Sequence, residues 1–428
     1  MLLEFGKSNY LDKARQQPEK FKEALYKVKN DGLRQTFKAI QSKLEEPVPL
    51  GYCNVGVIID SNIANFIKGD RVISNGSHAE TVSVSPNLCA KIPDNVDDES
   101  AAFTVLGAIG LQGIRLLKPT IGETIVVTGL GLVGLICVQI LRANGCHVIG
   151  IDYDKSRCEL AKSFGASVVN LSDDENPIEF ANHLTSGYGV DSAIITAGTK
   201  SNDPIELAIN LLRDRGSITV VGQVSMNINW GKAYEKEIKI NLSRSYGPGR
   251  YDKKYEEKGI DYPIGYVRWT EKRNMQAFLE LLEHKRISLE KLITKTYDFT
   301  DSVNTYDEIL DEKQLILGVA FRYSKSSKDL KKTIVYENKK YPISESLLGV
   351  GFIGGGNYTK AHLLPNFSNN KKVRLVGICT FNGRNSDFLA KKYNFEYSTS
   401  EIDKIIDDDS INCVVISTRH DMHSDLVV

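Results

Sequence analysis

The sequence predicts an α/β protein built on doubly wound parallel sheets, and three observations carry this prediction. From about Ala101 onward, apolar β-type runs alternate with helical runs, which is the pattern of β-α units in a parallel sheet. The fingerprint Gly129-x-Gly131-x-x-Gly134 follows the apolar run "TIVVT" and opens a helical run. A second glycine cluster, in "VGFIGGGNYTKAH", repeats this arrangement near the end of the 428 residues.

The expected elements follow in chain order. Residues 18–46 have the apolar stripes of two helices, broken by "NDG". From Pro49, short strands are expected in "VGVIID", "DRVISNG", "AETVSVSP" and "LCAKIP". Further strands are then expected in "TIVVTG", "HVIGID", "SVVNL", "VDSAIITAG", "SITVVG", "EIKINLSRS" and "LILGVAFRY", most of them separated by helices. The polar run "SKSSKDLKKT" predicts a linker, after which the β-α alternation restarts at Leu348.

Composition limits the classes of partner. Lys plus Arg and Asp plus Glu both number 54, so no charge excess favours nucleic acid or an anionic membrane. No apolar run approaches the roughly 20 residues of a membrane span, and the first residues lack the pattern of a signal peptide. The seven scattered cysteines form no CxxC pair, which favours reduced thiols. We therefore expect a cytoplasmic protein with a small-molecule substrate, and self-association into a homo-oligomer stays open.

The first fingerprint predicts a dinucleotide site in which each glycine has its own role. Gly129 allows the tight turn, Gly131 leaves room for the pyrophosphate, and Gly134 lets helix and strand pack closely. Asp152 ends the next strand, where a carboxylate accepts hydrogen bonds from ribose hydroxyls and repels a 2′-phosphate. NAD is therefore favoured over NADP, although Arg157 lies nearby. The predicted contacts are Gly129, Gly131, Leu132, Val133, Gly134, Asp152, Arg157, Ala197 and Gly222.

Several consecutive motifs over residues 47–323 resemble the medium-chain dehydrogenase/reductase family, the alcohol dehydrogenase superfamily. They include "PLGYCNVGVIID", "KGDRVISNG", "VVTGLGLVGL" and "PIELAINLLRDRGSITVVG". The resemblance implies a GroES-like β-rich catalytic domain, 1–104 and 247–323, which carries the N-terminal helical segment. It also implies an inserted Rossmann domain, 105–246. Because such folds open with strands before this region, we expect the GroES-like domain to be incomplete at its N-terminus.

The same resemblance points away from zinc. Zinc members have a ligating His where this chain has Tyr52, and a Cys or Glu near the positions of Phe103 and Thr104. Zinc needs three or four converging ligands, and Cys53 and His78 are too few. Catalytic zinc is therefore not expected, and an acid must polarise the carbonyl. Tyr52 and His78 are the predicted catalytic residues.

The segment after the linker (324–346) resembles the opening of a Gfo/Idh/MocA-type Rossmann domain, 347–428. Together the two parts resemble bacterial two-module oxidoreductases, often encoded with surface-polysaccharide genes. Gly354, Gly356, Asn357 and Tyr358 are the predicted cofactor contacts. Cys379 and Thr380 stand where an acid would bind ribose, which opens this site to NADP. Only part of such a domain is expected, because the family's Glu-Lys-Pro signature does not occur before Val428.

The distinctive run 243–274 is rich in Arg and Tyr, which suit an anionic or sugar-containing substrate. Arg250, Tyr266 and Arg268 are the predicted substrate contacts, and packing of these aromatics within the protein is the alternative. The sequence thus predicts an NAD(P)-dependent enzyme acting on CH–OH groups, with a sugar derivative as the expected substrate. A non-catalytic dinucleotide-binding scaffold or sensor, and a zinc-dependent alcohol, threonine or sorbitol-type dehydrogenase, are the alternatives.

Overall fold

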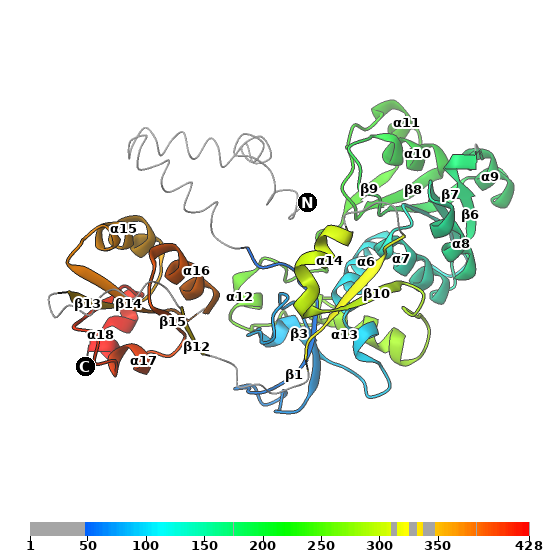
Figure 1. Ribbon diagram of the computed structural model, residues 1–428. Coiled ribbons are helices and arrows are strands. Elements are labelled where there is room, and N and C mark those ends of the chain that lie inside the picture. The colour runs from blue at the N-terminus through cyan, green and yellow to red at the C-terminus, as the bar shows by residue number, and fades with distance from the viewer. Residues whose placement is uncertain are drawn as a thin grey trace. The chain divides into compact units, whose positions relative to one another are not determined.

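The computed structural model describes residues 48–173, 175–309, 315–324, 332–336, 347–381 and 383–427. Two compact units divide this part of the chain, the first being Leu50–Ser324 and the second lying within Lys325–Val428. Among the described residues, the first unit holds three sheets and the second holds one (Figure 1). The helices predicted for 18–46 lie outside the described residues.

The largest sheet has six parallel strands in the order β6-β5-β4-β7-β8-β9. Its strands are β4 (Thr124–Thr128), β5 (His147–Asp152), β6 (Ser167–Asn170), β7 (Val190–Ile195), β8 (Leu212–Val220) and β9 (Lys239–Leu242). The chain order reverses between β4 and β7, because β5 and β6 extend the sheet to one side and β8 and β9 to the other. In such sheets the ligand crevice lies beyond the carboxyl ends of the strands at this switch point.

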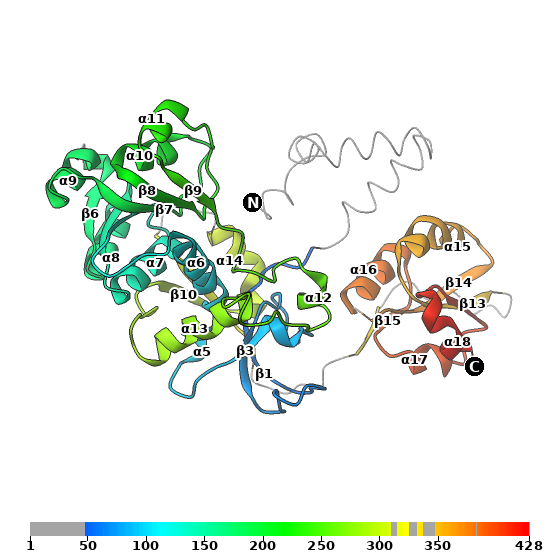
Figure 2. The same cartoon turned by 180° about the vertical axis from the view of Figure 1, so that it is seen from behind.

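Helices cover both faces of this sheet (Figures 1 and 2). The helices α6 (Thr104–Leu117), α7 (Leu132–Ala143) and α8 (Lys155–Ser163) share a core with Ile125 and Val127 of β4. The helices α9 (Pro177–Leu184) and α10 (Asp203–Leu211) share the opposite core with Val126. Successive residues of a strand face opposite ways, so a strand buried on both faces is apolar throughout. The short α11 (Trp230–Glu235) precedes β9.

Two smaller sheets complete the first unit. The antiparallel sheet β1-β2-β3 consists of β1 (Asn54–Val57), β2 (Arg71–Ser74) and β3 (Cys89–Lys91). The parallel pair is β10 (Ile293–Asp298) and β11 (Gly318–Arg322). The helices of this part are α5 (Asp98–Ala101), α12 (Lys253–Glu256), α13 (Glu271–Glu283) and α14 (Ser302–Ile309).

One predicted strand is wrong. Residues 79–86 form bends and the start of a short 3₁₀ turn rather than a strand. Both edges of β2 are already paired, with β1 and β3, and the His78 N–H donates to the Leu50 carbonyl at 2.8 Å. An alternating apolar pattern forms a strand only where a partner strand can accept its hydrogen bonds.

The helix α13 packs tightly on α6, because a Cβ at Gly107 would lie 2.2 Å from the Phe278 ring. Its first residue, Glu271, has an exposed fraction of 0%. Both carboxyl oxygens of Glu271 lack a hydrogen-bond partner among the described residues. Burial, assisted by Glu256 and opposed by Arg250, raises the pKa of Glu271 to about 8. The first unit therefore carries a neutral buried acid at pH 7.

The second unit holds the sheet β12-β15-β14-β13-β16, in which only β12 is antiparallel to its neighbour. Its strands are β12 (Thr333–Val335), β13 (Leu348–Ile353), β14 (Val373–Cys379), β15 (Tyr397–Thr399) and β16 (Cys413–Ile416). A π-helical turn (Thr359–Leu363) leads into α15 (Leu364–Ser368), and α16 (Gly383–Tyr393), α17 (Asp403–Ile406) and α18 (His423–Val427) follow. The parallel strands again reverse their order beside the first strand, here between β13 and β16.

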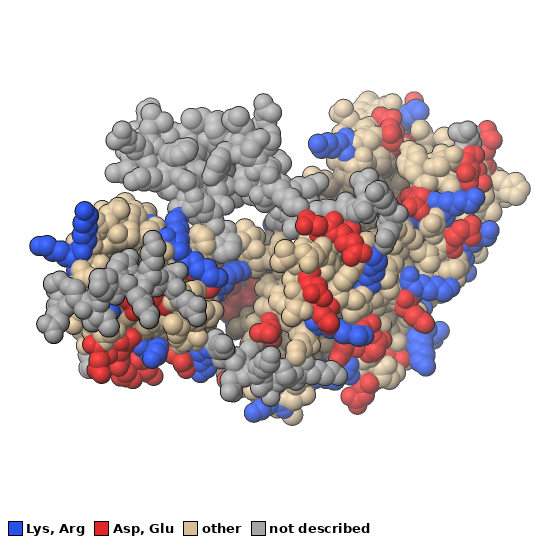
Figure 3. All heavy atoms as spheres, viewed as in Figure 1, with Lys and Arg blue, Asp and Glu red and all other residues tan. Residues whose placement is uncertain are grey.

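The surface matches the balanced composition. Basic and acidic side chains both occur across each unit on the face shown in Figure 3. None of the helices in the described ranges is long and apolar enough to span a bilayer.

We expect Gly134→Ala to destabilise the first unit, because a Cβ there would lie 2.0 Å from the Gly129 carbonyl oxygen. Overpacking of this kind costs roughly 1–3 kcal/mol. Gly131→Ala is the matched control, since its Cβ would meet nothing within 4 Å. Thermal unfolding of the two variants should show a lower Tm for Gly134→Ala alone, and equal Tm values would contradict the packing role of Gly134.

We expect Glu271→Gln to raise stability at alkaline pH. Folded Glu271 keeps its proton up to about pH 8, whereas in the unfolded chain it releases the proton above its ordinary pKa of 4.5. The contribution of Glu271 to the free energy of unfolding is therefore fully present below about pH 4.5 and is lost as pH rises towards 8. Calorimetry should therefore find the variant more stable at pH 8.5, by at most roughly 4–5 kcal/mol since each pKa unit is worth about 1.4 kcal/mol, with little difference below pH 4.5. Glu280→Gln, at an exposed position of the same helix, is the control.

Candidate functional site

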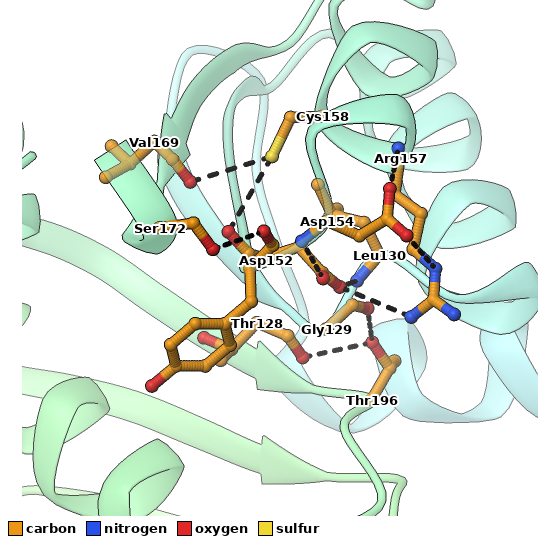
Figure 4. A network of polar contacts seen from close by, with 11 residues as sticks. Thr128, Gly129, Leu130, Asp152, Asp154, Arg157, Cys158, Val169, Ser172 and Thr196 are labelled. Carbon is orange, nitrogen blue, oxygen red and sulfur yellow. Dashed lines mark hydrogen bonds and ion pairs between the residues drawn. The ribbon is translucent and has the colours of Figure 1, made fainter. Parts of the chain in front are cut away.

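The turn after β4 is fixed to the end of β7. Gly129 has φ +91°, and a Cβ there would lie 2.6 Å from the Ala197 nitrogen. The Thr196 hydroxyl donates a 2.5 Å hydrogen bond to the Gly129 carbonyl (Figure 4). Only glycine tolerates this combination of left-handed backbone and close approach. The turn is therefore held at the switch point of the sheet.

The next glycine leaves the site open. Gly131 is the N-cap of α7, and the space where its Cβ would lie is empty to 4 Å. The first N–H groups of the helix, at Leu132, Val133 and Gly134, have no intrahelical acceptor. Free N–H groups and the positive end of the helix dipole are suited to phosphate. The backbone thus fits the pyrophosphate of a dinucleotide.

Asp152 lies at the end of β5, opposite this turn (Figure 4). One carboxylate oxygen accepts from the Leu130 N–H at 2.6 Å, and the other accepts from the Asp154 N–H at 2.9 Å. Arg157 Nη1 lies 3.9 Å from the same carboxylate. These contacts fix an acid beside the open turn, where a ribose would bind, with a single cation close by.

Ala197 and Gly222 follow β7 and β8. A Cβ at Gly222 would lie 2.0 Å from the Ala197 carbonyl oxygen, and the Gly222 N–H donates to Ile195 at 2.9 Å. The two loops therefore lie against each other at the carboxyl edge, next to the Gly129 turn. All the predicted contacts of the first fingerprint lie along this edge or on the helix and strand that end there.

The structure also brings together the chain segments that carry the two predicted catalytic residues. Gly51 has φ +79°, and its Cβ would lie 2.5 Å from the His78 ring, so the imidazole packs on the residue next to Tyr52. The ring of Phe321 contacts His78 edge-on at 5.3 Å between centroids. Burial lowers the pKa of His78, which keeps the imidazole neutral at pH 7. Burial, with a smaller effect of Cys53, raises the pKa of Tyr52, which keeps its hydroxyl protonated.

The donors here do not fit zinc. Cys53 and His78 are the Cys and His side chains that these loops offer, and zinc needs three or four converging ligands. Phe103 and Thr104 are buried and offer no suitable ligand. Across the described ranges, no group of three or more His, Cys, Asp and Glu side chains could hold a metal ion.

The three predicted substrate residues have different surroundings. Arg250 forms an ion pair with Glu256. The Arg268 guanidinium lies 3.8 Å from the centre of the Trp269 ring, which Arg115 also contacts at 3.3 Å. Tyr266 is 91% exposed. Within the described part of the chain, no hydrogen bond, ion pair or ring contact joins Arg250, Tyr266 and Arg268 to one another, so their shared role stays a prediction.

The second unit repeats the glycine geometry. Gly354 has φ +108°, and a Cβ there would lie 2.7 Å from the Ser417 backbone. The Ser417 hydroxyl donates to the Gly354 carbonyl at 3.0 Å, and Gly356 borders open space. Asn357 and Tyr358 are exposed at the helix entrance. The next strand, β14, ends at the buried Cys379 rather than at an acid.

Sequence reasoning assigned no site role to Glu271, and it placed Arg244 in the Arg- and Tyr-rich run 243–274 without making it a predicted substrate contact. Glu271 reads as an ordinary first-turn acid, and nothing in the sequence indicates that it is buried. Arg244 follows the last strand of the large sheet by two residues. Its position just after that strand was the feature of the sequence that could have indicated a place at the ligand-binding edge of the sheet.

Comparisons with known proteins support this fold. Residues 133–258 match the family model described as zinc-binding dehydrogenase. Residues 348–428 match the oxidoreductase family with an NAD-binding Rossmann fold. Both matched families are oxidoreductases.

Among curated relatives, sorbitol dehydrogenase of Halalkalibacterium halodurans is 28% identical over 60% of this chain and 68% of its own length. D-guloside 3-dehydrogenase of Escherichia coli is 29% identical over 64% of this chain and 77% of its own.

Among solved structures, galactitol-1-phosphate dehydrogenase from Escherichia coli has a TM-score of 0.54 at 20% identity, covering 63% of this chain and 83% of its own. Alcohol dehydrogenase TADH from Thermus sp. ATN1 has a TM-score of 0.53 at 18% identity, covering 65% and 86%. These likenesses confirm the predicted α/β fold class. Residues 133–258 are therefore similar to zinc-binding dehydrogenases, and residues 348–428 are similar to the oxidoreductase family with an NAD-binding Rossmann fold, so the two segments of the chain resemble two oxidoreductase modules.

Proposed function

We propose that the chain is an NAD-dependent oxidoreductase that interconverts an alcohol and a carbonyl on a sugar derivative without catalytic zinc. The observation that carries this proposal is the first glycine turn. There an open Gly131, a helix N-terminus and a fixed Asp152 meet at the switch point of a parallel sheet. The names of the curated relatives, which are polyol and sugar dehydrogenases, support a polyhydroxylated substrate. A role in surface-polysaccharide metabolism is part of the same proposal.

The cofactor preference follows from charge. A 2′-phosphate at the ribose would meet the Asp152 carboxylate, which two backbone N–H groups hold in place. Arg157 lies 3.9 Å from this carboxylate and partly offsets its charge. We therefore propose NAD at the first site. At the second site, Thr380 replaces the acid, so NADP is proposed as its acceptable ligand.

The chemistry is divided between the cofactor and two side chains. The nicotinamide, when bound, supplies or accepts the hydride. The Tyr52 side chain is 48% exposed and its pKa is raised above the ordinary 10.0, so its hydroxyl is protonated at pH 7 and would donate a hydrogen bond to the substrate oxygen. The neutral His78 imidazole accepts the alcohol proton during oxidation and returns it during reduction.

We also propose boundaries for the domains and the linker along the chain. Residues 1–104 and 247–323 would form the catalytic domain around the inserted cofactor domain, 105–246. Residues 324–346 would link it to the second cofactor-binding segment, 347–428. Support comes from the boundary between the compact units, which falls between Ser324 and Lys325.

Calorimetric titration tests the cofactor site. We expect NADH to bind, and to bind more tightly than NADPH. Asp152→Ser should narrow or reverse this preference by at least about tenfold, because it removes the charge that a 2′-phosphate would face. Asp154→Ser, which changes the next carboxylate along the chain, is the control. Failure of NADH to bind the wild-type protein would sink the proposed function.

The pH profile of NAD-dependent polyol oxidation tests the catalytic pair. Because the pKa of His78 is lowered, the rate should be flat near pH 7 and fall only as pH drops below 6.5. His78→Gln should abolish this acid limb, and Tyr52→Phe should lower kcat by about 10²-fold. Cys53→Ala should have little effect. An unchanged profile in His78→Gln would remove the histidine from the mechanism, and no turnover with any polyol would favour a non-catalytic scaffold.

A further inference from the structure

Arg244 extends from the carboxyl edge of the large sheet. The strand β9 ends at Leu242, and the Ser243 N–H still donates to Val220 of β8 at 2.9 Å. Arg244 is the next residue and is exposed. This is the edge of the sheet along which the glycine turn, Ala197 and Gly222 lie. Arg244 thus leaves the sheet on the side where ligands bind in parallel α/β folds.

No acidic side chain in the described ranges neutralises the positive charge of Arg244. Its guanidinium lies 4.2 Å from the centre of the Tyr251 ring, and that of Arg250 lies 4.1 Å from the same ring. Glu256 neutralises Arg250 through an ion pair. Within the described ranges, no hydrogen bond or ion pair reaches the Arg244 side chain. The pair of arginines around Tyr251 therefore keeps one net positive charge.

The segment that carries these residues is held in an unusual conformation. Positive φ angles alternate along it, at Ser245 (+56°), Gly247 (+129°), Gly249 (+106°) and Tyr251 (+68°). Two of these residues are not glycine, and such strained positions persist only where their surroundings fix them. Strain of this kind concentrates at binding and catalytic sites. The backbone thus presents Tyr251 and its arginines in one fixed arrangement.

Tyr246 ties this segment to the turn of the catalytic pair. It is almost fully buried, and its hydroxyl accepts a 3.0 Å hydrogen bond from Asn75 Nδ2. The Asn274 side chain donates to the Tyr246 carbonyl, also at 3.0 Å. Asn75 precedes His78 by three residues, on the loop that follows β2. The cationic segment and the proposed proton carrier are therefore anchored to each other.

We propose that Arg244, stacked on Tyr251, is the binding site for an anionic group of the substrate, a phosphate or a carboxylate. This inference rests on the proposed function and names the substrate class for it. A guanidinium stacked on an aromatic ring keeps its planar N–H fork free for two oxygens of one anion. Arg250, whose charge Glu256 already meets, supports the ring rather than binding the anion.

Isothermal titration of the full chain with sodium phosphate and with sodium acetate tests this site, against sodium chloride at equal ionic strength. The titrations are run without cofactor and with saturating NADH and NADPH, because the bound cofactors would cover the two phosphate-binding glycine turns, after β4 and after β13. We expect one of the two oxyanions to bind the cofactor-bound protein more tightly than chloride. Tighter phosphate binding would identify a phosphorylated substrate, and tighter acetate binding a carboxylated one.

Variants assign the binding to Arg244. Arg244→Gln should weaken the oxyanion by about tenfold or more, which is the size of one charge-assisted hydrogen bond. Arg244→Lys should retain part of the affinity, since it keeps the charge without the planar fork. Arg215→Gln, an exposed arginine near the opposite end of β8, should bind like the wild type. An unchanged Tm for Arg244→Gln would show that the loss is local.

Two results would overturn the proposal: neither oxyanion binding better than chloride, or Arg244→Gln binding as tightly as the wild type. Both are distinct from failure of the proposed function, which would appear as absent NADH binding. In that case the titrations without NADH still compare Arg244→Gln with the wild type. A difference between them would preserve the anion site on its own.

Discussion

The position of one carbonyl group determines the geometry of the first site. The Gly129 carbonyl accepts the Thr196 hydroxyl at 2.5 Å, and Gly134 approaches the same oxygen so closely that a Cβ would lie 2.0 Å from it. The end of β4, the end of β7 and the first turn of α7 are thus fixed around a single atom. The ends of β4 and β7 and the first turn of α7 cannot shift relative to one another without disturbing the contacts around the Gly129 carbonyl oxygen. The open space beside Gly131 is kept for this reason. The second sheet uses the same device, with Ser417 donating to Gly354.

The two glycine turns differ in what faces them. At the first, the Asp152 carboxylate is held by the Leu130 and Asp154 N–H groups, so its orientation is set before any ligand arrives. At the second, β14 ends at Cys379, and burial raises the pKa of this thiol to about 11, which keeps it uncharged. Similar backbone geometry therefore combines with different strand-end residues. A carboxylate ends the strand that faces the first turn, and an uncharged thiol ends the strand that faces the second.

Much of the fold was predictable because its signals are local. The apolar runs of β4, β5 and β7 and the glycine spacing each report a backbone requirement that no distant residue has to supply. The strand expected at residues 79–86 failed because strand formation depends on a free partner edge, which the alternating pattern of a single segment does not reveal. The β8 strand likewise begins at Leu212, inside the run "PIELAINLLRD" whose apolar spacing is helical, because pairing with Val190 of β7 overrides helical propensity there.

The substrate side was less predictable, because tertiary pairing decides which charge is available. Arginines at positions 244 and 250 look equivalent in the sequence, yet Glu256 neutralises Arg250 and no described acidic side chain pairs with Arg244. Glu271 reads as an ordinary helix-start acid, yet complete burial keeps it protonated at pH 7. Once these groups are set aside, Arg244 is the cation in the 243–251 segment whose charge no described neighbour offsets. A cofactor site formed by backbone groups can be predicted from the spacing of glycines in the sequence. A substrate site formed by charged side chains can be identified only when the ion-pair partners of those side chains are known.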